Sequence, residues 1–212
     1  MSTIDLTIPE ARVPDREGRQ RLLESAAEIF ARKGYAAATV REIVTSARVT
    51  PPVLYYHFGN KEGLFLALTK DAWDRFDAVV EEALAEGGSA RERFLRLSER
   101  VFSLFRERIG TARVLYSVNY GPRERAPHFD FDAYHERFRQ VVKHLVEEGI
   151  RAGELRPGDP EATMWALLGA VNIAMEVELC HPELTFGREG LRRVLEAIFR
   201  GVASPRGKER RT

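Results

Sequence analysis

The chain has 212 residues, of which 44% are hydrophobic, and it carries 33 basic and 32 acidic side chains. This length and apolar content exclude a disordered protein and allow either one large core or a small domain joined to a medium one. The near-neutral total hides an uneven distribution. Residues 12–61 hold nine basic and five acidic side chains, whereas residues 62–203 hold twenty basic and twenty-four acidic. The basic segment indicates a surface that faces an anion.

The single cysteine, Cys180, excludes an internal disulfide and cannot form a thiolate metal site alone. The first thirty residues contain no apolar run of signal-peptide length. No stretch approaches the roughly 18 apolar residues that a membrane span needs. We therefore expect a cytoplasmic protein with no membrane partner.

The chain begins irregularly and then becomes helical. Residues 1–14 lack periodicity and include two prolines, so we expect a flexible arm there. Apolar residues then recur at helical spacing over 22–31, and Lys33 and Gly34 supply a basic last turn followed by glycine. This pattern predicts a first helix of about four turns.

Two short helices are predicted next. Thr39 followed three residues later by Glu42 has the pattern of a capping box, which predicts a helix over 40–47. Thr50 can cap a third helix over 51–58, because prolines in a first turn lack only N–H groups that would have no intrahelical partner.

A fourth, longer helix is predicted from Asn60, which can cap it, to a break at Gly87-Gly88. Further helical periodicity is centred on residues 94–105, 112–116, 134–146, 162–179 and 188–202. No alternating run argues for a strand. We expect an all-α protein of about nine helices. The predicted parts are a flexible arm at 1–14, a first domain at 15–62, a second at 63–203 and a disordered basic tail at 204–212.

Two short helices joined by a tight connection at 46–49, directly after a longer helix, have the outline of a helix-turn-helix. In that motif the second short helix enters the major groove of DNA. Val53, Leu54 and Phe58 can face the first two helices, which leaves the other side chains of 50–57 to look outward. Two consecutive tyrosines and a histidine would be poor surface design for a helix that touched nothing. The alternative is that the tyrosines pack against the fourth helix.

Residues 39–43 read Thr-Val-Arg-Glu-Ile, and residues 49–65 read Val-Thr-Pro-Pro-Val-Leu-Tyr-Tyr-His-Phe-Gly-Asn-Lys-Glu-Gly-Leu-Phe. Over roughly 17–66 the chain closely resembles the DNA-binding region of the TetR family of bacterial regulators. The resemblance implies a dimeric repressor with a divergent C-terminal ligand domain and two recognition helices that read a palindrome. One departure is Arg48, which stands where family members usually have glycine. If this position needs a positive φ, arginine costs about 1 kcal/mol, although its side chain could reach a phosphate.

The expected DNA contacts divide into two kinds. Helix N-termini favour phosphates, so Thr39 and Lys61 should contact the backbone. The residues expected at base edges are Thr50, Pro51, Pro52 and Tyr55. The other residues expected to donate to phosphates are Tyr56 and His57. The arginines Arg12, Arg16 and Arg19 either add a minor-groove or backbone contact or belong to a solvated arm.

The helices beyond residue 66 combine aromatic and polar side chains in a way that suits a mainly apolar ligand held by one or two hydrogen bonds. The candidate ligand-binding residues are Phe94, Phe102, Phe105, Tyr116, Tyr120, Phe138, Trp165, Asn172 and Glu176. The alternative for any one of these aromatic residues is a place in the core.

The last two helices are apolar enough to need a partner, so a four-helix homodimer seam is expected. Its candidate residues are Trp165, Leu168, Val171, Met175, Leu191, Val194, Leu195 and Ile198. Such a dimer would place two recognition helices about 34–36 Å apart, one turn of DNA.

The cluster His128, Asp130, Asp132 and His135 could suggest a metal or acid-base site, but a polar, Asp-rich helix start is expected from capping alone. No nucleophile elbow, phosphate loop or metal-binding helix motif occurs. We therefore expect no cofactor, no metal and no enzyme. The leading hypothesis is a repressor that binds an operator and is released by an apolar small molecule. The alternatives are a small-molecule carrier or enzyme with a structural N-terminal domain, and an architectural DNA-binding protein.

Overall fold

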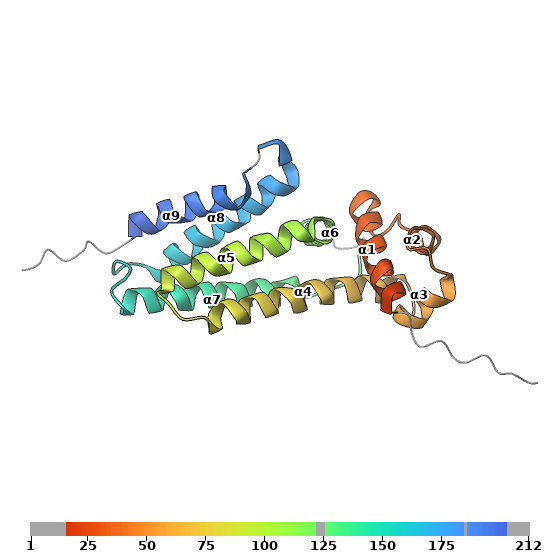
Figure 1. Ribbon diagram of the computed structural model, residues 1–212, viewed down its shortest axis with the longest axis horizontal. Helices are drawn as coiled ribbons and strands as arrows, with labels where there is room; N and C mark the ends of the chain where they lie inside the picture. Colours follow the sequence, from red (N-terminus) through yellow and green to blue (C-terminus); the bar gives the residue numbers. More distant parts are fainter. Residues whose placement is uncertain (1–15, 122–125, 185, 203–212) are drawn as a thin grey trace, which may run out of the picture. The chain divides into compact units, whose positions relative to one another are not determined.

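The computed structural model describes residues 16–121, 126–184 and 186–202 (Figure 1). The predictions for the arm at 1–14, with Arg12, and for the tail at 204–212 lie outside these residues. Within them the chain is all-α, as expected, with nine α-helices and one short 3₁₀ turn. The helices are α1 (Arg16–Lys33), α2 (Val40–Ser46), α3 (Pro51–Phe58), α4 (Lys61–Ala85), α5 (Ala90–Glu107), α6 (Ile109–Asn119), α7 (Phe131–Arg151), α8 (Pro160–Cys180) and α9 (Gly187–Val202), with the 3₁₀ turn η2 (Pro182–Leu184) before α9.

The chain divides into two compact units, and the division falls inside α4, between Leu68 and Thr69. We predicted a domain boundary at 62–63, six residues earlier. In the first unit, α1, α2 and α3 pack against one another. The apolar stripe of α1 is buried, as its spacing predicts, and Ile43, Leu54 and Phe65 complete the core from the other helices. Burial of these side chains holds the two short helices, which are too short to be stable alone.

Local sequence signals fix the ends of the helices in the first unit. The Thr39 hydroxyl accepts a hydrogen bond from the Glu42 backbone N–H, and the Glu42 carboxylate accepts one from the Thr39 N–H, so the predicted capping box is present. The Asn60 side chain accepts from the Gly63 N–H at 2.7 Å and caps α4. Both caps use backbone donors that would otherwise have no partner.

The second unit is built around α5, α7, α8 and α9, which contact one another in turn (Figure 1). One hydrophobic core runs through all four helices, and the part of α4 beyond Thr69 adds Val80 and Ala83 to it. Asp130 accepts from the Ala133 N–H and caps α7, which is the role expected for the acidic start of that helix.

The expectation that no stretch could span a membrane is wrong as regards length and composition, because α8 is long and apolar enough to pass that test. One side of α8 is nevertheless buried in the core of the second unit. The buried residues are Met164, Leu167, Leu168, Ala170, Val171, Ala174 and Met175. A helix that is apolar nearly all round is also what a buried core helix looks like.

Truncation of the centre of α8 should therefore destabilise the protein strongly. Leu167 is fully buried, so Leu167→Ala is expected to lower the free energy of unfolding by about 2–5 kcal/mol through lost burial and a cavity. Leu184→Ala, at a leucine that is 60% exposed on η2, is the matched control and should change it by less than about 0.5 kcal/mol. Chemical denaturation measures both, and equal losses would contradict the described core.

Candidate functional site

Helix α3 is held by a single fully buried side chain and exposes most of its others. Leu54 is its one buried residue, while Tyr55 is 52% and Tyr56 is 70% exposed. The alternative that both tyrosines pack away against α4 is therefore wrong. Val53, His57 and Phe58 are half-buried and flank Leu54. Two large aromatic side chains are thus displayed on a helix of eight residues.

The side chains at the start of α3 are also exposed. Thr50 occupies the N-cap position with extended backbone angles, but its hydroxyl makes no capping hydrogen bond. Pro51 and Pro52, in the first turn, are exposed. Thr50 therefore presents an uncommitted hydroxyl beside two apolar rings, a mixture that can meet both polar base edges and a thymine methyl group.

The turn between α2 and α3 carries backbone strain. Arg48 has φ +54°, the left-handed region that favours glycine, so the condition under which arginine is costly here is met. Arg48 is exposed and the Val49 N–H donates to the Val44 carbonyl, which closes the turn at 3.0 Å. The fold therefore accepts an unfavourable residue at the point that sets the direction of α3.

Replacing this residue separates strain from charge. Arg48→Gly should raise the free energy of unfolding by about 0.5–1 kcal/mol, because glycine adopts this φ without a Cβ clash. Arg48→Ala removes the same charge but keeps the Cβ, so its stability should stay near that of the parent. Thermal or urea unfolding of the three proteins measures this, and a stabilised alanine variant would show that strain is not the cause.

Thr39 and Glu42 lie at the other helix start expected near DNA. Their capping box uses the Thr39 hydroxyl twice, since it also donates to the Glu42 carboxylate at 2.9 Å. The pKa of Glu42 is lowered to about 2, chiefly by its hydrogen bond from Lys33 and then by those from Thr39. The carboxylate is therefore ionised at neutral pH. Contact of Thr39 with DNA stays a prediction, and its hydroxyl is already engaged within the protein.

Lys61 has a role within the protein that the sequence did not indicate. Its ammonium donates to the carbonyls of Tyr35 and Ala38, both at 2.9 Å, and lies 4.4 Å from the centre of the Tyr35 ring. That ring packs in turn against Phe30 and Phe65. Lys61 therefore holds the segment before α2 against the start of α4. The phosphate contact stays a prediction, and it would have to share this ammonium.

Loss of these contacts should be measurable without DNA. Lys61→Ala is expected to lower the free energy of unfolding by about 1–3 kcal/mol, because charge-assisted hydrogen bonds to two carbonyls are removed. Arg32→Ala, at an exposed cation near the end of α1, is the matched control and should be almost neutral. No difference between the two variants in urea unfolding would leave Lys61 without a structural role.

Three further residues make contacts at or near α3 that the sequence did not indicate. A Cβ at Gly63 would lie 2.0 Å from the Phe58 carbonyl oxygen, so only glycine fits the tight passage from α3 to α4. The Arg21 side chain donates to the Ala47 carbonyl at 3.1 Å and joins α1 to the end of α2. The Arg19 guanidinium lies 5.5 Å from the centre of the Phe58 ring. These contacts join residues up to 39 positions apart, so local patterns do not reveal them.

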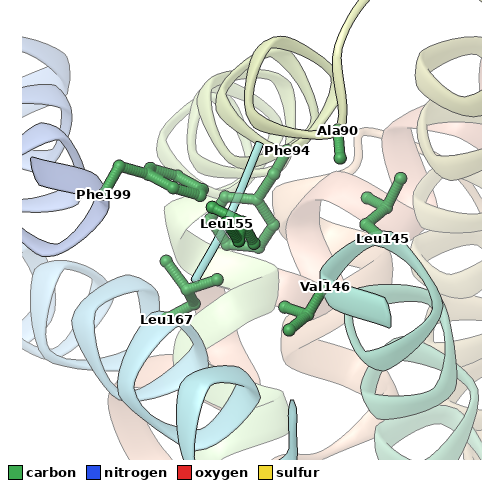
Figure 2. A pocket seen from close by; sticks show the side chains of 7 residues that line it. All are labelled: Ala90, Phe94, Leu145, Val146, Leu155, Leu167 and Phe199. Carbon is green, nitrogen blue, oxygen red and sulfur yellow. The ribbon is translucent and has the colours of Figure 1, made fainter. Parts of the chain in front are cut away.

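The predicted ligand residues of the second unit do not form one site. Phe94 and Phe102 are fully buried core residues, and only Phe94 lines the apolar hollow that Figure 2 shows. The other side chains around that hollow are Ala90, Leu145, Val146, Leu155, Leu167 and Phe199. The hollow has no room for a water molecule. A ligand could enter only if α5, α7, α8 and α9 moved apart.

Three other ligand candidates lie together on the surface of α8. Trp165 is 50% exposed, and Asn172 and Glu176 are exposed with it.

The predicted dimer seam needs correction, because five of its eight residues are buried in the core of the chain itself. These five are Leu168, Val171, Met175, Leu191 and Leu195. Trp165 and Val194 are exposed and Ile198 is half-buried, so they remain available, and Ile173, which is 50% exposed, joins them.

Two aromatic clusters take up the remaining candidates. Phe138 of α7 packs edge-on against Phe76 of α4 at 5.3 Å, and Phe76 packs against Trp73 at 5.6 Å. Phe105 and Tyr120 both contact Tyr116, at 6.0 and 5.6 Å between ring centres. The second cluster thus brings together three of the nine predicted ligand residues.

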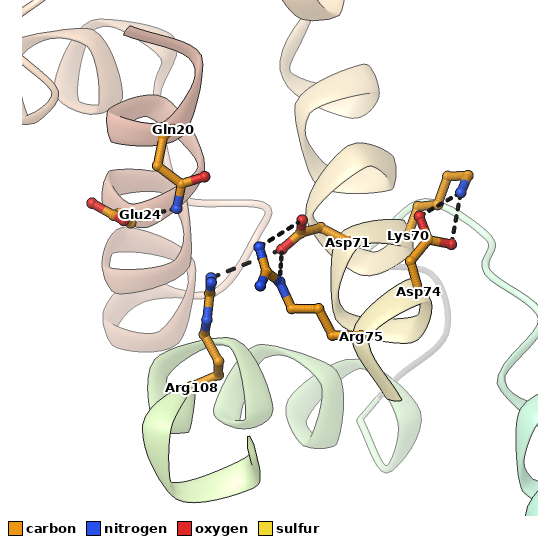
Figure 3. Close-up of polar contacts among 7 residues, drawn as sticks. All are labelled: Gln20, Glu24, Lys70, Asp71, Asp74, Arg75 and Arg108. Atoms are coloured by element: carbon orange, nitrogen blue, oxygen red, sulfur yellow. Dashed lines mark hydrogen bonds and ion pairs between the residues drawn. The ribbon is translucent and has the colours of Figure 1, made fainter. Parts of the chain in front are cut away.

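Ion pairs link α4 to the start of α6 within the second unit (Figure 3). Asp71 accepts from the Arg75 side chain at 2.9 Å and also lies 3.8 Å from Arg108, which joins α5 to α6. Lys70 pairs with Asp74 one turn along α4. Asp71 therefore connects α4 to the helices that carry the second aromatic cluster.

Comparison with known proteins relates both units to one family. A model described as bacterial regulatory proteins, tetR family, matches residues 22–68, and a tetracyclin repressor-like C-terminal domain matches residues 87–176. The chain is 34% identical over 109 residues to the transcriptional activator FasR of Mycolicibacterium smegmatis, covering 51% of this chain and 50% of that protein. It is 29% identical over 140 residues to the transcriptional repressor KstR2 of the same organism, covering 66% and 68%.

A solved structure shares the fold along nearly the whole chain. The ketosteroid transcriptional regulator KstR2 of Mycobacterium tuberculosis aligns with a TM-score of 0.73 over 92% of this chain and 98% of that one, at 21% identity. The family models thus match parts of both units, and the similarity in fold extends along 92% of the chain.

Proposed function

Because the chain belongs to the TetR family of bacterial transcriptional regulators, a non-enzymatic family of DNA-binding proteins, we propose that it is a cytoplasmic, dimeric repressor that binds a palindromic operator and is released by a mainly apolar effector. This family rules out the enzyme alternative. Residues 15–62 are proposed as the DNA-binding domain and residues 63–203 as the effector and dimerisation domain.

The exposed side of α3 carries the proposal for DNA reading. Thr50, with its unengaged hydroxyl, caps the helix that would enter the major groove, and the exposed Tyr55 lies on that helix. Tyr56 and His57 stand next to Tyr55 and are proposed to donate to phosphates. Arg48 and Lys61 flank α3 and would add positive charge at both of its ends.

Base-reading residues can be told from phosphate-binding ones by comparing two DNA molecules. Thr50→Ala or Tyr55→Ala should weaken operator binding by about 1–3 kcal/mol and binding to random DNA by much less. Tyr56→Phe is the comparison variant, since it removes only a hydroxyl proposed to meet the backbone and should weaken both equally. Fluorescence anisotropy at fixed salt measures all of these, and equal losses for Thr50→Ala on both DNAs would place this residue on the backbone instead.

The proposed dimer uses the exposed apolar residues of α8 between Trp165 and Ile173. Four residues without a charged side chain recur at helical spacing on α8 and are exposed in the single chain: Trp165, Ala166, Gly169 and Ile173. Exposed apolar residues gathered in this way are typical of a surface that binds another protein. Val194 adds an exposed apolar residue from α9. Such a surface supports helix packing against a second copy, because small residues let helices approach closely.

A charge placed on this surface should separate the copies. Ile173→Asp is expected to shift the protein from twice the chain mass of 24.1 kDa to the monomer, since an unpaired carboxylate cannot be buried cheaply. Leu184→Asp adds the same charge at an exposed leucine outside α8 and should leave the dimer intact. Sedimentation equilibrium distinguishes the two masses, and a dimeric Ile173→Asp protein would place the interface elsewhere.

The effector is proposed to act by opening the second unit. The apolar hollow between α5, α7, α8 and α9 has no room for a water molecule, so a ligand that binds there must favour a different arrangement of these helices. Helix α4 begins at Lys61 in the first unit and continues to Ala85 in the second, so it belongs to both. A change in α4 could therefore alter the spacing of the two recognition helices.

Relatives are named as an activator and as a repressor. We propose repression for this chain, because that is what the resemblance of its DNA-binding region implies.

A further inference from the structure

A small aromatic patch lies where α6 runs beside the end of α8. It consists of Phe105, Tyr116 and Tyr120, with Phe105 edge-on to Tyr116 at 73° and Tyr120 tilted at 48°. The Tyr116 hydroxyl lies 3.9 Å from the Met175 sulfur, which ties this ring to α8. Tyr120 is 75% exposed, more than any other large hydrophobic side chain in the described part of the chain. The patch therefore combines an anchored ring with one that is open to solvent.

A carboxylate without a cation accompanies this patch. Glu176 is exposed on α8, and no hydrogen bond or ion pair to its side chain occurs among residues 16–121, 126–184 and 186–202. The neighbouring Glu178 differs, because Arg106 lies 3.2 Å from it. The pKa of Tyr116 is raised to about 12, chiefly by burial and further by nearby ionisable groups that include Tyr120 and Glu176. Burial and the nearby Glu176 carboxylate thus both act on the Tyr116 hydroxyl.

We propose that Phe105, Tyr116, Tyr120 and Glu176 bind the cationic group of an effector, a quaternary or alkylated ammonium. Aromatic faces attract such a cation through the ring quadrupole, and the carboxylate adds its charge. An anionic ligand would be repelled by Glu176. A neutral apolar ligand would cover this carboxylate without compensating its charge, which is unfavourable. Use of the site by an effector rests on the proposed function, whereas binding of the cation does not.

The two parts of such an effector would occupy different places on the second unit. The hollow beside Phe94 is lined by apolar side chains alone, whereas the patch offers rings and a negative charge. Phe105 stands near the end of α5, the same helix that supplies Phe94 to the hollow. An effector with an apolar body and one ammonium group matches both chemistries.

The test compares two small probes of similar size and shape, tetramethylammonium and neutral tert-butanol, binding to the full-length protein. Titrations followed by the NMR signals of tyrosine rings should show tetramethylammonium binding at least about fivefold more tightly. Tyr120→Leu and Glu176→Gln should each weaken tetramethylammonium binding about two- to fivefold. Glu161→Gln, at another exposed glutamate of α8, is the matched control and should leave it unchanged.

Equal affinity for the two probes would overturn the inference, and so would a Glu176→Gln protein that binds tetramethylammonium like the parent. Spectra of each variant without probe show whether it is folded, because signals away from the patch must coincide with those of the parent. Binding of DNA by the same preparations is measured separately. A protein that binds DNA but not the cation contradicts only this inference, and one that binds the cation but not DNA contradicts only the proposed function.

Discussion

The burial of Leu54 is the contact on which the proposed reading of DNA depends. It is the one buried side chain of α3, and it fixes which side of that helix faces α1 and α2. Because α3 has only eight residues, a single anchor leaves Tyr55 and Tyr56 exposed and the Thr50 hydroxyl unengaged. The strained Arg48 turn and the close passage at Gly63 then set the two ends of the helix.

The second unit depends on a different constraint, the packing of α8. This helix is apolar on most of its surface, so one side fills the core while the other stays exposed. The same composition that lets α8 resemble a membrane helix therefore supports its proposed role between two copies of the chain. The hollow beside Leu167 is too small for a ligand, so effector binding there would have to be coupled to movement of the surrounding helices, which is the physical requirement for a switch.

The sequence predicts best those features that depend on neighbouring residues. The Thr39 capping box and the Asn60 cap follow from local chemistry, and so do the helices themselves. Contacts between distant residues were not predictable in this way. Lys61 reaches carbonyls 23 and 26 residues away, and the sides of α8 could not be distinguished because both are apolar. This is why Trp165, expected in a ligand cavity, lies on the surface.

The central claim is that a dimer of this chain reads DNA through two copies of α3. Selection of bound sequences from a random pool of duplex DNA tests it most directly, because it needs no knowledge of the operator. The account predicts that the enriched sequences contain two inverted half-sites whose centres lie about one helical turn apart. Enrichment of a single half-site, or no enrichment over the starting pool at physiological salt, would contradict it.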